Sequence, residues 1–135
     1  MGRNRQTAKL AAATVVALLL AAFFGFVGYS KAFASLSDLE RYGAWTIHLP
    51  ELAGRLVGWS EMIGAALLVA SVAVPRLRPL AVAVAIYFIA NQLAAAAVHA
   101  RHGEAAALPQ NAVIIAAFIA IALVMRGRKQ RQESD

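Results

Sequence analysis

Long apolar runs alternate along the chain with short segments that carry most of its charged residues. The apolar runs cover residues 10–29, 52–74, 80–100 and about 108–125. Each run is close to the roughly 20 residues that an α-helix needs to cross about 30 Å of hydrocarbon. The pattern therefore predicts an all-α, integral membrane protein, folded as an antiparallel bundle of four transmembrane helices.

Composition supports one membrane domain over residues 1–135. The chain is 61% hydrophobic, whereas a soluble domain is roughly 45–50% apolar. Once four helices are assigned, only short tails and loops remain. The net charge of +6 does not indicate nucleic-acid binding, because the basic residues lie at segment ends and no soluble domain carries them.

The basic residues are distributed unequally between the two ends of the predicted helices. Nine lie at one end, namely Arg3, Arg5, Lys9, Arg76, Arg78, Arg126, Arg128, Lys129 and Arg131. Four lie at the other end, namely Lys31, Arg41, Arg55 and Arg101. By the positive-inside rule, we expect both termini to be cytoplasmic in a multi-pass protein of the bacterial cytoplasmic (inner) membrane.

A cleavable signal peptide is the alternative interpretation of the N-terminal segment. A basic start, an apolar stretch and the small-residue sequence over 32–34 have the general form of a leader. The apolar stretch exceeds the roughly 7–15 residues of a leader core, and Lys31 interrupts the approach to the supposed cleavage site. We therefore expect a retained first helix.

The first loop, over residues 30–51, is the longest connection and is expected to contain a short interfacial helix. Residues 37–40 have the capping-box pattern, and Gly43 is a plausible end for this helix. The aromatic and imidazole rings of this loop are expected at the level of the lipid headgroups. They are Tyr42, Trp45 and His48.

Glu61 is the first functional candidate, because a carboxylate inside an apolar span is costly and usually faces a partner or a cavity. Gly54, Gly58 and Glu61 follow steps of four and three, so they share one helix face. Gly54 and Gly58 form a GxxxG pair, which is typical of close helix packing. We therefore expect Glu61 to point into the bundle.

The third span carries Asn91, Gln92 and His99 among apolar residues. Glu61 and Asn91 each lie nine residues inward from the end of their spans, or about 13 Å, so they can meet. Glu61 with Asn91 or Gln92 would form the floor of a polar pocket open to the outer face, with His99 nearer the external surface. The alternative for Asn91 is a hydrogen bond that only joins helices.

Lys31, which ends the first span, is the best candidate counter-ion for Glu61. Its side chain could bend inward to the carboxylate or extend outward to the interface, and both alternatives stay open. Arg55 lies six residues before Glu61, on a different part of the helix surface, whereas Glu51 lies four residues before Arg55. We therefore expect Arg55 at the rim, paired with Glu51.

The sequence contains no self-contained catalytic motif, and no catalytic residue can be assigned. His99 and His102 could ligate a metal or haem, but no second intramembrane histidine supplies an opposite ligand, so we expect no metal site. The chain has no cysteine, which excludes thiol redox chemistry carried by the chain itself. Phosphate-binding loops and serine-hydrolase elbows are also absent from the sequence.

The order and spacing of several short motifs resemble the DoxX-like family of small four-helix bacterial membrane proteins. These motifs are GYSK over 28–31, GWSEMIGA over 58–65, PRLR over 75–78 and AVHARHG over 97–103. The resemblance singles out Lys31, Glu61 and His99. Namesakes of the family are linked to quinone-coupled sulfur oxidation and to membrane redox complexes, which implies at most a quinone-linked oxidoreductase subunit.

These observations lead to three hypotheses. The first is an accessory subunit of a redox or stress-response assembly, with no intrinsic cofactor and a pocket for a quinone or another lipophile, in which Tyr29 and Trp59 supply aromatic walls. The second is a small proton-coupled transporter, and the third is a purely structural scaffold. The expected partners are the lipid bilayer, a redox partner protein and further copies of the chain, but no nucleic acid.

Overall fold

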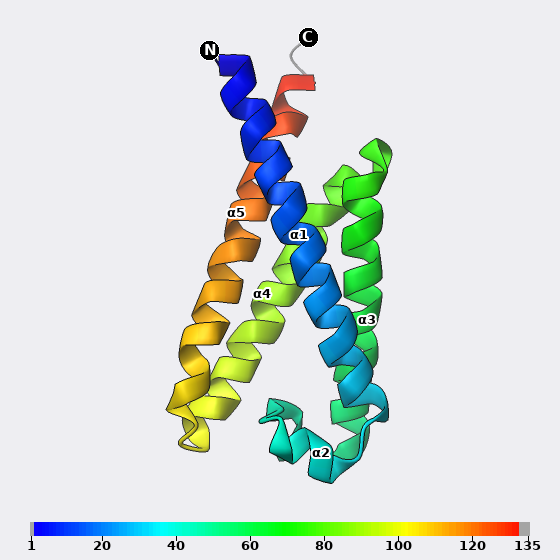
Figure 1. Ribbon diagram of the computed structural model, residues 1–135, viewed down its shortest axis with the longest axis vertical. Coiled ribbons are helices and arrows are strands. Elements are labelled where there is room, and N and C mark those ends of the chain that lie inside the picture. The colour runs from blue at the N-terminus through cyan, green and yellow to red at the C-terminus, as the bar shows by residue number, and fades with distance from the viewer. Residues whose placement is uncertain (1, 133–135) are drawn as a thin grey trace.

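The computed structural model describes residues 2–132, with side chains described as far as Gly127, so the side chains of Arg128, Lys129 and Arg131 lie outside the description. Its long helices are α1 (Gly2–Phe33), α3 (Glu51–Ala73), α4 (Arg78–Arg101) and α5 (Leu108–Gln132). No strand occurs in this part of the chain. Both ends of the chain lie at one end of the molecule, and the connection from α1 to α3 lies at the opposite end (Figure 1).

Within the described residues, four helical segments are long and apolar enough to cross a membrane. Their positions confirm the four predicted spans. Helix α1 begins at Gly2, well before the predicted start at residue 10. The apolar pattern marks only the part of a helix that lies in hydrocarbon, and the preceding residues include good helix formers such as Lys9.

Short helices connect the long ones. The α1–α3 connection holds α2 (Leu36–Arg41) and the 3₁₀ helix η1 (Trp45–His48), which lie together across the end of the bundle (Figure 1). Two further 3₁₀ turns, η2 (Pro75–Leu77) and η3 (Ala105–Ala107), precede α4 and α5. The short helix expected in the first loop is therefore present.

The start of α2 differs from the capping box predicted over residues 37–40. Ser35 is the N-cap, and its hydroxyl accepts the Asp38 N–H at 3.2 Å. The same hydroxyl donates to the Asp38 carboxylate at 2.7 Å, which fixes Ser35 rather than Ser37 in the capping position. Gly43 follows the helix with φ +68°, so the predicted stop is confirmed at a conformation that glycine adopts readily.

Helices α1 and α3 approach each other closely where Gly28 and Gly58 face each other. A Cβ at Gly58 would lie 2.6 Å from the Gly28 carbonyl oxygen, and a Cβ at Gly28 would lie 2.7 Å from the Gly58 carbonyl oxygen. Gly54 instead faces Thr46 of η1, whose carbonyl oxygen would be 3.2 Å from an added Cβ. The two glycines of the GxxxG pair thus serve two different contacts.

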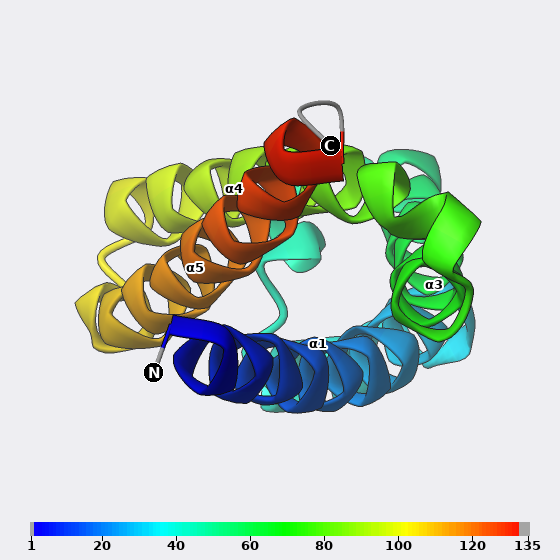
Figure 2. The ribbon, with the colours of Figure 1, turned by 90° about the horizontal axis from the view of Figure 1, so that it is seen from above.

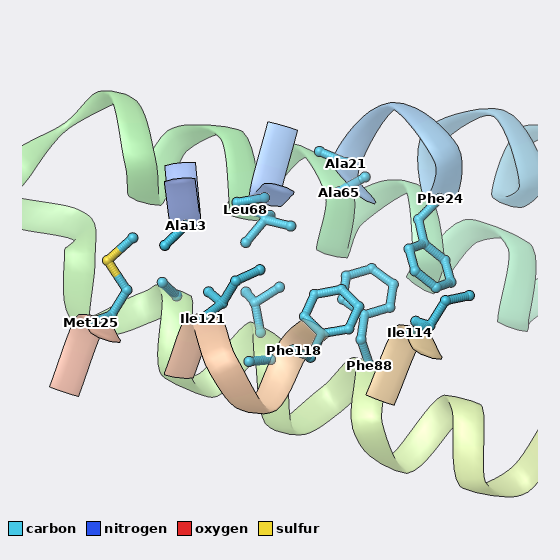
Figure 3. Close-up of a cluster of buried hydrophobic side chains, with 14 residues drawn as sticks. Ala13, Ala21, Phe24, Ala65, Leu68, Phe88, Ile114, Phe118, Ile121 and Met125 are labelled. Atoms are coloured by element: carbon cyan, nitrogen blue, oxygen red, sulfur yellow. The ribbon is translucent and has the colours of Figure 1, made fainter. Parts of the chain in front are cut away.

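The apolar core lies between all four long helices, and Figure 3 shows its side chains. Phe24 of α1, Phe88 of α4 and Phe118 of α5 are fully buried and in mutual contact, with the rings of Phe88 and Phe118 stacked and that of Phe24 tilted against them. The ring centroids of Phe24 and Phe88 are 4.2 Å apart, and those of Phe88 and Phe118 are 4.9 Å apart. Because lipid is as apolar as these side chains, close packing rather than water exclusion holds them together.

The helices pack unevenly around this core. Helix α1 packs chiefly against α3, and α4 packs chiefly against α5, whereas α1 and α5 touch much less. Viewed along the long axis, α1 and α4 lie on opposite sides, with α3 at one edge and α5 crossing at the other (Figure 2). This arrangement leaves α1 and α5 free to diverge toward the end that carries α2.

Candidate functional site

A buried ion pair joins α1 to α3. Lys31 Nζ lies 2.6 Å from Glu61 Oε1 and 2.9 Å from Glu61 Oε2. Lys31 is 4% exposed and Glu61 is completely buried. Lys31 also lies in the last turn of α1, where the helix dipole favours a positive charge. Of the two alternatives left open by the sequence, the inward orientation of Lys31 is the one the structure shows.

Asn91 connects this pair to α4. Its Nδ2 donates to Glu61 Oε1 at 2.9 Å, so the carboxylate receives hydrogen bonds from two neighbouring helices. A buried carboxylate is tolerated when it is paired and its oxygens accept hydrogen bonds. The network ties three helices together at one depth, and it leaves no surface of Glu61 exposed.

Arg55 holds the end of α1 from the side of α3. Its Nη1 donates to the carbonyl oxygens of Lys31 at 2.9 Å and Ala34 at 2.6 Å, and its Nη2 pairs with Glu51 at 3.1 Å. The last carbonyls of a helix have no partner within the helix, and a guanidinium can satisfy several of them. The expected pairing with Glu51 is present, and the bonds to the α1 carbonyls are additional.

Beside the ion pair lies a cavity of about 470 Å³, bounded by α1, the α2–η1 segment, α4 and the η3–α5 segment. Its lining combines polar and apolar residues: Phe23, Phe24, Phe26, Val27, Ser30, Lys31, Leu39, Tyr42, Gly43, Ala44, Trp45, Gln92, His99, Ala106, Ala107, Gln110, Asn111 and Ile114. Phe24 and Ile114 also belong to the apolar core shown in Figure 3. The cavity therefore borders the core. This volume is in the range of sites that hold a small organic molecule.

Lys31 and Gln92 are therefore cavity residues, whereas Glu61 and Asn91 lie behind Lys31. The Lys31 ammonium faces the ring of Trp45, with 5.6 Å between Nζ and the ring centroid. Gln92 Oε1 accepts a hydrogen bond from Asn111 Nδ2 at 2.8 Å, which joins α4 to α5 across one wall. The polar residues of the wall are Lys31, Trp45, His99, the three amides Gln92, Gln110 and Asn111, and the hydroxyl residues Ser30 and Tyr42.

Two lining residues have buried polar atoms without a hydrogen-bond partner among the described residues. They are Trp45 Nε1, which is a donor, and Asn111 Oδ1, which is an acceptor. Trp45 is 8% exposed and Asn111 is 7% exposed. Such atoms are rare in proteins, because each costs about 1–3 kcal/mol when it is left unpaired. A third such atom, Thr46 Oγ1, belongs to the residue that packs against Gly54.

A second hollow, the α1–α5 groove, lies next to the cavity on the outside of the bundle. Its lining has no polar surface and consists of Leu20, Phe23, Pro109, Gln110, Val113 and Ile114. The cavity and the groove share Phe23, Gln110 and Ile114. The two hollows therefore adjoin where α1 and α5 diverge.

All three histidines of the chain meet at the end of the bundle, where they form the histidine cluster with Glu104. Glu104 bonds His99 Nδ1 at 2.6 Å and His48 Nε2 at 3.0 Å, and the rings of His48 and His102 stack with centroids 3.7 Å apart. Hydrogen bonds from His99 and His48 hold the pKa of Glu104 below its usual value. Nowhere among the described residues do three or more His, Cys, Asp or Glu side chains form a group suited to a metal ion.

Tyr29 and Trp59 do not line the cavity, which corrects the prediction that they wall it. Tyr29 is 58% exposed, Trp59 is 48% exposed, and both rings contact Phe33 on the outer surface. Each lies two residues before a buried polar side chain, Lys31 or Glu61, and positions two apart on a helix do not face the same way. Trp45, by contrast, is buried in the cavity lining beside Lys31.

The sequence interpretation missed Asn111 and Glu104. Asn111 follows Pro109 near the start of a predicted span, where a polar residue reads as part of a helix end. Glu104 lies in a short loop and reads as an ordinary surface acid. A weak signal for Asn111 was available, because an amide already inside an apolar helix usually bonds to a neighbouring helix.

Comparison with known proteins gives one positive result. The family model described as the DoxX-like family matches residues 15–123, which include α3, α4 and most of α1 and α5. A search of curated proteins and a search of solved structures each found no match. Because the matched region covers most of the chain, including Lys31, Glu61 and His99, this protein belongs to the DoxX-like family.

Proposed function

We propose that this protein binds one lipophilic molecule with a polar head in its cavity, as an accessory subunit of a membrane redox or stress-response assembly. A quinone is the candidate ligand that the family resemblance implies. In this proposal the bundle is antiparallel, lies in the bacterial inner membrane with both termini in the cytoplasm, and carries the cavity in its outer half. The excess of basic residues at the end that holds both termini supports this orientation.

The observation that carries the proposal is that the cavity adjoins the α1–α5 groove and shares three lining residues with it. A molecule dissolved in the bilayer could place its tail in the apolar groove and its head in the polar part of the cavity. Phe23, Gln110 and Ile114 would line its passage, because they belong to both hollows. A water-soluble ligand would have no use for an apolar groove that faces lipid.

The ion pair has a supporting part in this proposal. Glu61 is completely buried and does not line the cavity, so it would act on a ligand through Lys31 rather than by contact. Its carboxylate holds the ammonium in place, and the ammonium faces the ligand together with the amide of Gln92 and the imidazole of His99. In this proposal Glu61 therefore does not exchange protons with the ligand.

The enclosed position of Glu61 also favours a second candidate, in which the network of Lys31, Glu61 and Asn91 serves only to lock the helices. Both candidates predict that loss of the ion pair destabilises the bundle. They differ over the cavity, which has no role in a purely structural scaffold.

Lipid extraction and native mass spectrometry of the purified protein test the proposal, with two matched variants. Ala107→Phe places a ring in the cavity lining, whereas Ala105→Phe places the same ring on the same 3₁₀ turn at an exposed position outside the lining. We expect a lipophile to copurify with the wild type and Ala105→Phe, and to be lost from folded Ala107→Phe. Equal retention by both variants, or no bound molecule in any of the three proteins, would contradict the proposal.

A further inference from the structure

Two residues of the cavity lining each have a buried polar atom without a partner, one a hydrogen-bond donor and the other an acceptor, and a ligand head that reaches both must complement both. The donor is the indole N–H of Trp45 and the acceptor is Oδ1 of Asn111. They come from different elements, η1 and α5, and both residues are more than nine-tenths buried. The other amide atom of Asn111, Nδ2, is already committed to Gln92 Oε1 at 2.8 Å.

A ligand that satisfies both atoms must itself carry an acceptor and a donor. A carbonyl or an ether oxygen can accept from Trp45 but has no hydrogen to offer Asn111. A hydroxyl group can do both, because its oxygen accepts and its hydrogen donates. The Lys31 ammonium beside Trp45 adds a positive charge that favours the lone pairs of an oxygen atom in the head, which both ligand classes possess.

We propose that the cavity selects lipophiles whose polar head carries a hydroxyl group, of the phenol or hydroquinone class, over those whose head only accepts hydrogen bonds, so that of a quinone and its reduced form the hydroquinone is the preferred ligand. This inference rests on the proposed function, since it specifies the head of the lipophile that the cavity binds. It assigns Asn111 the recognition of the hydroxyl hydrogen. Trp45 recognises the oxygen, which both ligand classes possess.

The test compares 4-hexylphenol with 4-hexylanisole, which differ by one methyl group on the oxygen. Binding is measured as the ligand-dependent rise in melting temperature of the purified full-length protein, titrated to an apparent Kd. We expect the wild type to bind the phenol roughly tenfold more tightly than the anisole, the ratio that about one buried hydrogen bond supplies. This measurement needs no variant.

Two variants test separately the recognition of the hydroxyl oxygen and that of the hydroxyl hydrogen. Trp45→Phe removes the N–H and keeps an aromatic ring beside Lys31, so it should weaken both ligands by a similar factor and leave their ratio unchanged. Asn111→Leu removes the acceptor with little change in size, so the ratio should fall to about one. If the added methyl group caused the preference by its bulk, the ratio would persist in Asn111→Leu.

The outcomes distinguish failure of this inference from failure of the proposed function. Equal binding of phenol and anisole by the wild type would overturn the inference and leave the lipophile site intact. Tighter binding of the anisole would also overturn it, and would indicate that the Asn111 and Gln92 amides are turned so that a nitrogen faces the ligand. Binding of neither ligand, with water satisfying both atoms, would overturn the inference, and the proposed function would then be decided by the Ala107→Phe comparison.

Discussion

The Lys31 ammonium contacts both carboxylate oxygens of Glu61, at 2.6 and 2.9 Å, across the crossing of α1 and α3. Each charge is buried, and the energetic cost of burying either one is offset only when the other is present. The pair also sets the position of the single ammonium that lines the cavity. The stability of the bundle and the chemistry of the cavity therefore depend on the same contact.

Breaking this pair from one side should cost more than removing it altogether. Lys31→Met and Glu61→Gln should each lower the free energy of unfolding by about 3–5 kcal/mol, because either leaves an unpaired buried group. The double variant Lys31→Met/Glu61→Gln should lose much less than the sum of the two. Unfolding by denaturing detergent in a double-mutant cycle measures the coupling, and strictly additive losses would show that the two groups do not interact.

The contact between Gly28 and Gly58 should tolerate no side chain. In Gly58→Ala, the new Cβ would lie 2.6 Å from backbone atoms of Gly28 and Ala32, so α1 and α3 must separate. We expect a loss of about 1–3 kcal/mol or more. Gly25→Ala is the control on α1, because a Cβ there has nothing within 4 Å, and alanine should match or improve helix stability. Similar melting temperatures for the two variants would refute the close approach.

The bonds from Arg55 to the end of α1 should distinguish arginine from lysine. The guanidinium reaches the carbonyl oxygens of Lys31 and Ala34 and the carboxylate of Glu51 with two nitrogens. A lysine ammonium cannot reproduce this planar fork, so Arg55→Lys should lose about 1–2 kcal/mol despite the conserved charge. The exposed Arg41→Lys on α2 serves as the control and should be neutral. The comparison is made by thermal unfolding in detergent.

Stability should decline at acidic pH partly through Glu104. Because its pKa is lower in the folded protein than the ordinary value of 4.5, its contribution is present above pH 4.5 and is lost as the pH falls through the folded value. Glu104→Gln should remove this part of the acid dependence, whereas the exposed Glu40→Gln should keep it. Melting temperatures between neutral pH and about pH 3 test the prediction. Parallel profiles for Glu104→Gln and the wild type would rule out the contribution.

The sequence predicted the helices and the buried polar centre because both follow from local rules. Apolar length defines the spans, and the cost of a charge in hydrocarbon marks Glu61 whatever the rest of the fold. Lys31 and Asn91 were expected near it, and the structure brings both into direct contact with the carboxylate. His99, expected at the mouth of the pocket, is part of the cavity lining and also bonds Glu104.

The residues that were misplaced or missed are those whose role depends on which way the side chain points in the folded bundle, and a sequence pattern does not give that orientation. Tyr29 and Trp59 are close in sequence to the buried pair but point away from it, as helical spacing requires. The interfacial preference of tryptophan gave no sign that the α2–η1 segment turns Trp45 inward over Lys31. Asn111 reaches Gln92 only because α4 packs against α5, and this contact could not be predicted from the sequence.

Tryptophan fluorescence offers the most direct measurement of the central claim, that the cavity admits a lipophile from the bilayer. The chain has two tryptophans, so Trp59→Phe leaves Trp45 in the cavity lining, and Trp45→Phe leaves Trp59 on the outer surface. In lipid nanodiscs, a brominated alkylphenol should quench Trp45 saturably, and Ala107→Phe should abolish that saturable quenching. It should quench Trp59 only in proportion to its concentration in the lipid. If Trp45 is not quenched, or is quenched in the same unsaturable way as Trp59, the cavity does not bind lipophiles and the account is wrong.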